Sequence, residues 1–148
     1  MRPSLFLDAN VLFTAAHNPG GYSRALFSLA EAGFCALFTS AFAAEEARRN
    51  LLRKTPGRNP DWNRLIPLVS LGPEPPPALL ERLGGTGLPD KDLPILAAAV
   101  ASRCDGLVTG DRRHFGPLLD REVHGVQVLT PRAAFHAIVD RAAGRGNP

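Results

Sequence analysis

Several residue types that build specialised sites are scarce in this chain of 148 residues. It has only two cysteines, Cys35 and Cys104, and they form no CxxC motif. So few cysteines exclude a disulfide-rich scaffold and a cysteine-based zinc site, and we expect two buried free thiols. Tryptophan and tyrosine, which can stack on bases and also form a hydrogen bond, occur only once each, so strong base specificity is not indicated.

Long hydrophobic runs are absent as well, which excludes a segment that spans a bilayer. Only three apolar residues, Leu5-Phe6-Leu7, precede the charge of Asp8, and this does not fit a secretory leader. We therefore expect a cytoplasmic protein with no membrane partner. Hydrophobic residues make up 45% of the chain, which is enough for one core. We predict a single domain over residues 1–143 and a frayed tail at 144–148.

The charge balance is only mildly basic. The net charge of +3 comes from 17 basic and 14 acidic residues and is too small to argue for a nucleic-acid partner by itself. Basic residues do gather in two segments, namely Arg48, Arg49, Arg53, Lys54 and Arg58 in the first and Arg112, Arg113 and His114 in the second. Solvated helix faces explain such clusters equally well.

Short apolar strands alternate with helices along most of the chain. We predict strands at 5–7, 35–39, 106–109 and 126–129, and helices at 9–16, 22–32, 41–54, 91–103 and from 131 onward. The proline- and glycine-rich segment 55–89 indicates only short helices near 62–68 and 77–83 and a small strand near 68–71. Buried strands that alternate with helices predict an α/β fold with a mainly parallel central sheet.

Four acidic residues occupy the ends of predicted strands or the early turns of predicted helices. They are Asp8, Glu46, Asp92 and Asp111. Ligands of open α/β sheets bind beyond the carboxyl ends of the strands, so these side chains are expected to share one crevice. Carboxylates that crowd together repel each other, and a divalent cation relieves that repulsion. A site built only from carboxylates, with no His or Cys nearby, favours Mg²⁺ or Mn²⁺ over Zn²⁺.

Each acid also has an ordinary structural interpretation. Asp8 and Asp90 are suited to cap the helices that follow them, and Asp111 is suited to hold a turn. Glu45 has arginines three and four residues further on, so a surface ion pair explains it better than it explains Glu46. We take Glu46 and Asp92 as the ligands, and leave open a water-mediated role for Asp90.

Three stretches of this chain resemble the PIN-domain nucleases. They are LFLDANVLF, TSAFAAEEARRNLL and DKDLPILAAAVASRCDGLVTGDRRHF, and the last is the most specific. The family pattern puts the catalytic, metal-binding acids at Asp8, Glu46, Asp92 and Asp111. It makes Asn10 the polar companion of Asp8, counts Glu46 from the strand-end Ser40, and gives Thr109 a supporting hydroxyl.

The resemblance implies a three-layer α/β/α sandwich that is often dimeric. It further implies cleavage of single-stranded RNA with Mg²⁺ or Mn²⁺, and many bacterial members are toxins that pair with an antitoxin protein. The proline-rich segment 55–89 departs from compact toxin versions.

The expected reaction is hydrolysis of a phosphodiester by a metal-activated water. The candidates for contacting RNA phosphates are Arg48, Arg49, Arg53, Arg112 and Arg113. We leave His114 out of the catalytic set, because a histidine in such a turn more often forms a local hydrogen bond. Relief of repulsion further predicts that Asp111→Asn, without metal, is at least as stable as the wild type.

Two alternatives remain. One is a PIN-like scaffold that binds RNA or protein without cutting. The other is an aspartate-dependent phosphohydrolase, which the sequence disfavours because Asn10 stands where a second acid is needed. The only lysines, Lys54 and Lys91, also do not follow predicted strands.

Overall fold

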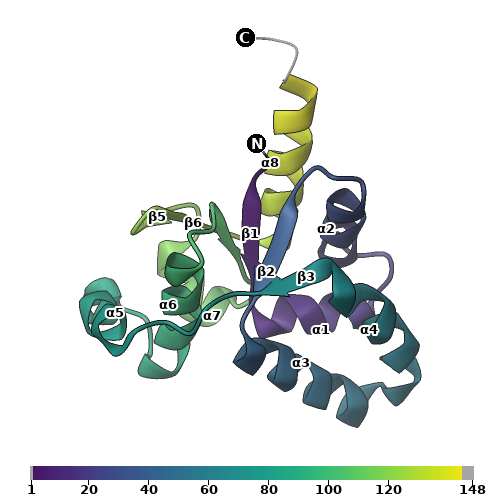
Figure 1. Cartoon of the computed structure of the whole chain (residues 1–148), viewed down its shortest axis with the longest axis horizontal. Coiled ribbons are helices and arrows are strands. Elements are labelled where there is room, and N and C mark those ends of the chain that lie inside the picture. The colour runs from purple at the N-terminus through teal and green to yellow at the C-terminus, as the bar shows by residue number, and fades with distance from the viewer. Residues whose placement is uncertain (1, 145–148) are drawn as a thin grey trace.

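The computed structural model describes residues 2–144, which form a six-stranded sheet between two layers of helices (Figure 1). The strands are β1 (Ser4–Leu7), β2 (Ala36–Thr39), β3 (Val69–Leu71), β4 (Gly106–Val108), β5 (Glu122–Val123) and β6 (Val126–Leu129). Their order is β3-β2-β1-β4-β6-β5, and every pairing is parallel except that of β5 with β6. The predicted α/β/α architecture is confirmed.

Eight α-helices surround the sheet within the described residues. They are α1 (Ala9–His17), α2 (Tyr22–Glu31), α3 (Ala41–Lys54), α4 (Asn59–Leu65), α5 (Pro77–Arg82), α6 (Leu93–Ala101), α7 (Arg112–Phe115) and α8 (Pro131–Ala143). Figure 1 shows α5 and α6 on one side of the sheet, and α1, α2 and α8 on the other. The predicted frayed tail lies outside the described residues, apart from Gly144 at the end of α8.

The core forms where the central strands are apolar on both faces. Phe6, Leu7, Leu107 and Val108 are fully buried, as expected for parallel strands covered on both sides. Helix α6 is buried along most of its length, because its alanines allow close packing against the sheet. Cys35 and Cys104 are free and buried, as predicted. No helix among residues 2–144 combines the length and apolar character that crossing a membrane requires.

The chain begins α6 later than the sequence pattern indicated, and the prediction that Asp90 caps this helix is wrong. A 3-10 turn covers Asp90–Asp92, and α6 starts at Leu93. Pro94 has no N–H to donate to the carbonyl of Asp90, so α-helical bonding cannot begin there. The helix also ends two residues early, because Arg103 adopts a left-handed backbone with φ of 55°.

The two short helices and the small strand predicted within segment 55–89 are confirmed. The segment holds α4, the edge strand β3, α5 and short 3-10 helices at Pro56–Arg58, Ile66–Leu68 and Leu83–Thr86. Further along the chain, α7, a 3-10 helix at Gly116–Leu118 and β5 were not predicted. Strand β5 turns into β6 through His124 and Gly125, which both have positive φ, as a two-residue hairpin requires.

One ion pair ties segment 55–89 to the rest of the fold. Arg24 of α2 donates to Asp61 of α4 over 2.8 Å and also to the carbonyls of Ala15 and Ala16, near the end of α1. The hydrogen bond from Arg24 lowers the pKa of Asp61, with smaller contributions from the charges of Arg24, Arg58 and Arg64. The ionised carboxylate is therefore favoured in the folded state.

Replacement of Asp61 with asparagine should reduce stability only where Asp61 is ionised. We expect Asp61→Asn to lower the free energy of unfolding by about 1 kcal/mol at neutral pH. A lowered folded pKa contributes stability above the unfolded pKa and loses it as the pH falls through the folded value. The difference from wild type should thus shrink below about pH 4 in urea titrations. Glu31→Gln, on the exposed side of α2, is the control, and an Asp61→Asn deficit that persists unchanged in acid would contradict this account.

Candidate active site

Asp8 lies at the carboxyl end of β1 and caps α1. Its Oδ1 accepts a hydrogen bond of 2.7 Å from the N–H of Ala9. Its Oδ2 accepts from the Thr109 hydroxyl at 2.9 Å and from the Asn10 amide at 3.2 Å. These bonds hold a carboxylate that is only 8% exposed.

Burial raises the pKa of Asp8. The hydrogen bonds from Thr109 and Ala9 act in the opposite direction, and the negative charges of Glu46 and Asp92 raise the pKa further. Asp8 therefore lies close enough to two other carboxylates for their charges to disfavour its ionised form. Repulsion of this kind between carboxylates is what the sequence predicts for acids that share one crevice.

The loop after β4 is braced against α1. The N–H of Gly110 donates to Asn10 Oδ1 over 2.8 Å, and the N–H of Asp111 donates to the Thr109 hydroxyl over 3.1 Å. A Cβ at position 110 would lie 3.2 Å from Asn10 Oδ1, so glycine allows this close approach. Asn10 and Thr109 thus join the ends of β1 and β4, which are neighbouring strands in the sheet.

Asp111 caps α7 and contacts His114, three residues further on. Its Oδ1 accepts from the N–H of His114 at 3.0 Å, and its Oδ2 lies 2.9 Å from His114 Nδ1. The local hydrogen bond predicted for His114 is confirmed. The same Nδ1 also lies 3.3 Å from Asp92 Oδ2, so the ring is close to two of the acids but is hydrogen-bonded only to Asp111.

Asp92 contributes an oxygen that is buried without a hydrogen bond. Its Oδ2 is inaccessible to solvent and has no hydrogen-bond partner within the described part of the chain. His114 Nδ1 lies 3.3 Å from this oxygen, but it is bonded to Asp111 at the shorter distance of 2.9 Å. A buried carboxylate oxygen without a partner is costly unless something else binds it.

Helix α3 carries the fourth acid. The Ser40 hydroxyl accepts from the N–H of Ala43 at 3.0 Å, so Ser40 caps this helix as predicted. Glu45 is exposed and pairs with Arg48 at 3.1 Å and with Arg49 at 3.9 Å. Glu46 instead lies near Asp8, and both side chains line one cavity, which is described next. The predicted division between the two glutamates agrees with these positions.

One cavity of about 290 Å³ collects these side chains. It is lined by Asp8, Ala9, Asn10, Phe42, Ala43, Glu46, Lys91, Asp92, Ile95, Asp111 and His114. We call it the acidic cavity. All four predicted acids line it, whereas Asp90 is exposed and lies outside it. Sequence reasoning set aside His114 and did not consider Lys91 or Phe42 for this site.

A family model described as PIN domain matches residues 4–113 of the chain. The chain belongs to the PIN-domain family. No curated protein matches it. PIN domains are generally nucleases, so the fold is a nuclease-type scaffold, and the matched region includes all four acids of the acidic cavity.

The residues of this PIN domain fit a divalent cation. One ligand atom each from Asp92, Asp111 and His114 lies within 4.8 Å of the others, and the unpartnered oxygen of Asp92 is among the atoms that a cation would satisfy. The expectation of an all-oxygen site with no histidine nearby is wrong, because the short helix α7 turns His114 back toward Asp111. Carboxylate oxygens still outnumber the imidazole.

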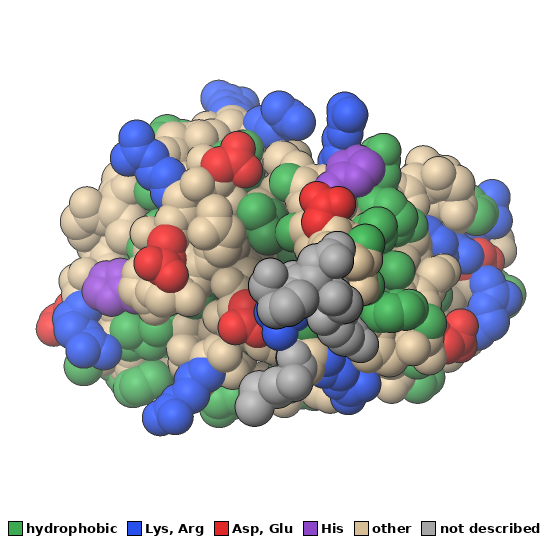
Figure 2. Space-filling model, turned by 90° about the horizontal axis from the view of Figure 1, so that it is seen from above, with side chains coloured by type: hydrophobic (Ala, Val, Ile, Leu, Met, Phe, Trp, Pro, Cys, Tyr) green, Lys and Arg blue, Asp and Glu red, His purple; other side chains and the backbone are tan. Residues whose placement is uncertain are grey.

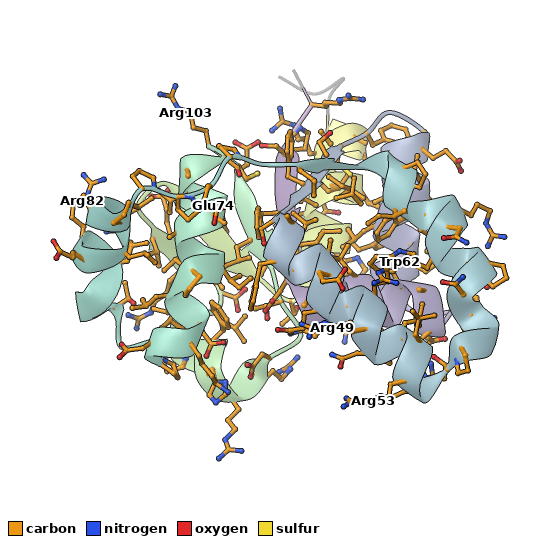
Figure 3. All side chains as sticks on the ribbon, turned by 60° about the horizontal axis from the view of Figure 1, so that its bottom comes forward. Arg49, Arg53, Trp62, Glu74, Arg82 and Arg103 are labelled. Atoms are coloured by element: carbon orange, nitrogen blue, oxygen red, sulfur yellow. The ribbon has the colours of Figure 1, made fainter. Side chains whose placement is uncertain are left out.

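The arginines predicted to bind phosphate lie on two helices, α3 and α7. Arg112 and Arg113 directly follow Asp111 and are exposed. Arg49 and Arg53 extend from α3 on the side turned forward in Figure 3, and Arg53 bonds to Asn50. Arg48 is held by Glu45. Figure 2 shows the opposite end of the PIN domain, near α8, where charges of both signs are dispersed.

Asp111→Asn should destabilise the metal-free protein, contrary to the expectation from repulsion alone. Burial by itself would raise the pKa of Asp111, but hydrogen bonds from the His114 backbone and ring outweigh it and lower the pKa. The folded state thus favours ionised Asp111. In chelator at neutral pH we expect a loss of about 1 kcal/mol, which fades as the pH falls below about 4. Urea titrations of Asp111→Asn and the exposed control Asp90→Asn test this, and equal or greater stability of Asp111→Asn would restore the repulsion argument.

Proposed function

We propose that the protein is a metal-dependent endoribonuclease that hydrolyses phosphodiester bonds of single-stranded RNA with Mg²⁺ or Mn²⁺. The observation that carries the proposal is the acidic cavity. Four carboxylates from four separate elements line it, and one of their oxygens is buried without a hydrogen-bond partner. Such a cluster is destabilising when empty and is suited to hard cations.

Each side chain has a distinct part in this proposal. Asp8, Glu46, Asp92 and Asp111 are assigned as ligands, directly or through water. Thr109 and Asn10 hold Asp8 in place, and Ser40 fixes the first turn of the helix that carries Glu46. His114 holds Asp111 in the lining of the acidic cavity. If these residues held Mg²⁺ or Mn²⁺, the ion would lower the pKa of a bound water and stabilise negative charge on the phosphate.

The arginines nearest the acidic cavity are the best candidates for binding the RNA backbone. Arg112 and Arg113 are exposed beside Asp111, and neither forms an ion pair within the described residues. Arg49 and Arg53 lie three and seven residues after Glu46, and so continue along the same face of α3. Contacts with phosphates from both groups would orient the strand without reading its sequence.

The antitoxin and homodimer partners implied by the resemblance, the toxin role and the cytoplasmic location stay predictions. A non-catalytic scaffold is the main alternative, and a cleavage assay separates it from an enzyme. Lys91 does line the acidic cavity, but it lies in the 3-10 turn before α6. An aspartate-dependent phosphohydrolase requires a lysine at the end of a strand, so the position of Lys91 does not support that alternative.

Neighbouring acids give a sharp test of the proposed ligands. We expect Asp8→Asn, Glu46→Gln and Asp92→Asn each to reduce Mn²⁺-dependent RNA cleavage by at least about 100-fold, because each removes charge that holds the ion. Glu45→Gln and Asp90→Asn should retain activity within about twofold, because their side chains lie outside the acidic cavity. Initial rates on a single-stranded RNA, with and without chelator, provide the measurement.

Circular dichroism and thermal melts of the same variants show whether the fold is intact. Near-normal cleavage by folded Asp8→Asn would refute the proposed site. Equal losses in Glu45→Gln and Glu46→Gln would show that the choice between these neighbours is wrong.

A further inference from the structure

A second cavity adjoins the acidic cavity and differs from it in chemistry. Its volume is about 320 Å³, and it lies between the start of α3, the chain after β3 and the start of α6. Its apolar lining consists chiefly of Phe42, Leu71, Pro73, Pro75, Pro94 and Ile95. We call it the apolar cavity. The two cavities share Phe42, Lys91 and Ile95, so they adjoin where the first turn of α3 faces the start of α6.

Phe42 is unusually exposed for a large hydrophobic residue. Its side chain is 62% exposed, and Leu71 across the apolar cavity is 61% exposed. Neither residue belongs to the hydrophobic core or packs against it, so the interior of the fold does not account for them. Exposed apolar surface that is concentrated at one cavity marks a binding site more often than scattered residues do.

We propose that the apolar cavity binds a nucleobase of the RNA next to the phosphodiester that is cut, with the Phe42 ring as its stacking surface. The inference rests on the proposed function, because it places the base by reference to a phosphate at the acidic cavity. Bases present a flat apolar face on a charged backbone, and aromatic side chains bind such faces in single strands. An apolar cavity that adjoins the acidic cavity, where the proposed cation would bind, matches that pair of features.

The charged residues around Phe42 favour a nucleic acid over an apolar peptide. Lys91 lines both cavities and forms no ion pair within residues 2–144, so its ammonium group is available to a phosphate between them. On α3, Phe42, Glu46, Arg49 and Arg53 follow at intervals of four, three and four residues, which places them on one face of the helix. A base site, a cation ligand and two arginines thus lie in line.

The polar lining of the apolar cavity is sparse, which indicates stacking rather than recognition of base edges. The polar side chains are Ser40, Glu74 and Lys91. The Ser40 hydroxyl is already bonded to the N–H of Ala43, and Glu74 lies on the segment between β3 and α5 (Figure 3). We therefore expect the site to accept any base, with differences that follow stacking strength.

Steady-state cleavage of a short single-stranded RNA by Phe42 variants tests the proposal. Loss of one stacked base is worth about 5- to 150-fold, so Phe42→Ala should raise KM by about tenfold and change kcat by less than about twofold. Phe42→Trp should keep the wild-type KM. Phe42→Leu, which retains apolar volume without a ring, should resemble Phe42→Ala. Leu52→Ala, also on α3 and 39% exposed, is the matched control and should behave as wild type.

An abasic substrate shows whether the contact is with a base. Removal of the base at one position beside the cut should raise the wild-type KM by a similar factor and abolish the difference between wild type and Phe42→Ala. A wild-type KM in both Phe42→Ala and Phe42→Leu would overturn the inference and leave the ribonuclease proposal intact. That result would fit a protein partner in the apolar cavity.

Failure of the proposed function is distinguishable from failure of the inference. If wild type cuts no RNA with Mn²⁺, the proposed function fails, and fluorescence anisotropy with the same RNAs then decides the inference. A weaker Kd in Phe42→Ala that Phe42→Trp restores would support base binding. An unchanged Kd across the Phe42 variants would overturn it.

Discussion

The buried carboxylate of Asp8 is held by three hydrogen bonds from two parts of the chain, and the geometry of the acidic cavity depends on them. The Thr109 hydroxyl donates from the end of β4, and the Asn10 amide and the Ala9 N–H donate from α1, the helix that Asp8 itself caps. Because β1 and β4 are adjacent parallel strands, these bonds fix the loop that carries Asp111 relative to Asp8. The cost of burying Asp8 near Glu46 and Asp92 is the basis for expecting a cation.

The same side chains serve the fold and the proposed chemistry. Asp8 caps α1 and Asp111 caps α7, so each has a structural role as well as a place in the acidic cavity. The pKa values of these two carboxyl groups are shifted in opposite directions. Burial and neighbouring charge raise the pKa of Asp8, whereas bonds from His114 hold the pKa of Asp111 below its usual range. The unfavourable burial of negative charge in the acidic cavity is therefore greatest at Asp8 and at the unpartnered oxygen of Asp92.

The sheet, the main helices and the grouping of four acids in one cavity could be predicted from the sequence. Apolar runs that end in a charge mark the carboxyl ends of buried strands, and this pattern located Asp8 and Asp111. Prediction from the sequence failed where geometry depends on short-range bonding. Pro94 delays α6, and this leaves Asp90 exposed outside the cavity. Helix α7 has four residues, too few for a periodic pattern, yet it returns His114 to Asp111 and Asp92. Phe42 was missed because exposure of a single ring beside a cavity is a property of the folded chain.

The central claim is that the acidic cavity holds a divalent cation between carboxylates that arrive from separate elements. A crystal of the protein soaked in Mn²⁺ and measured for anomalous scattering tests it most directly. The account predicts an anomalous peak in the acidic cavity at about 2.0–2.2 Å from oxygens of Asp8, Asp92 or Asp111, with Glu46 bound directly or through water. A cavity without a peak at millimolar Mn²⁺, with Asp92 Oδ2 still unpartnered, would contradict it.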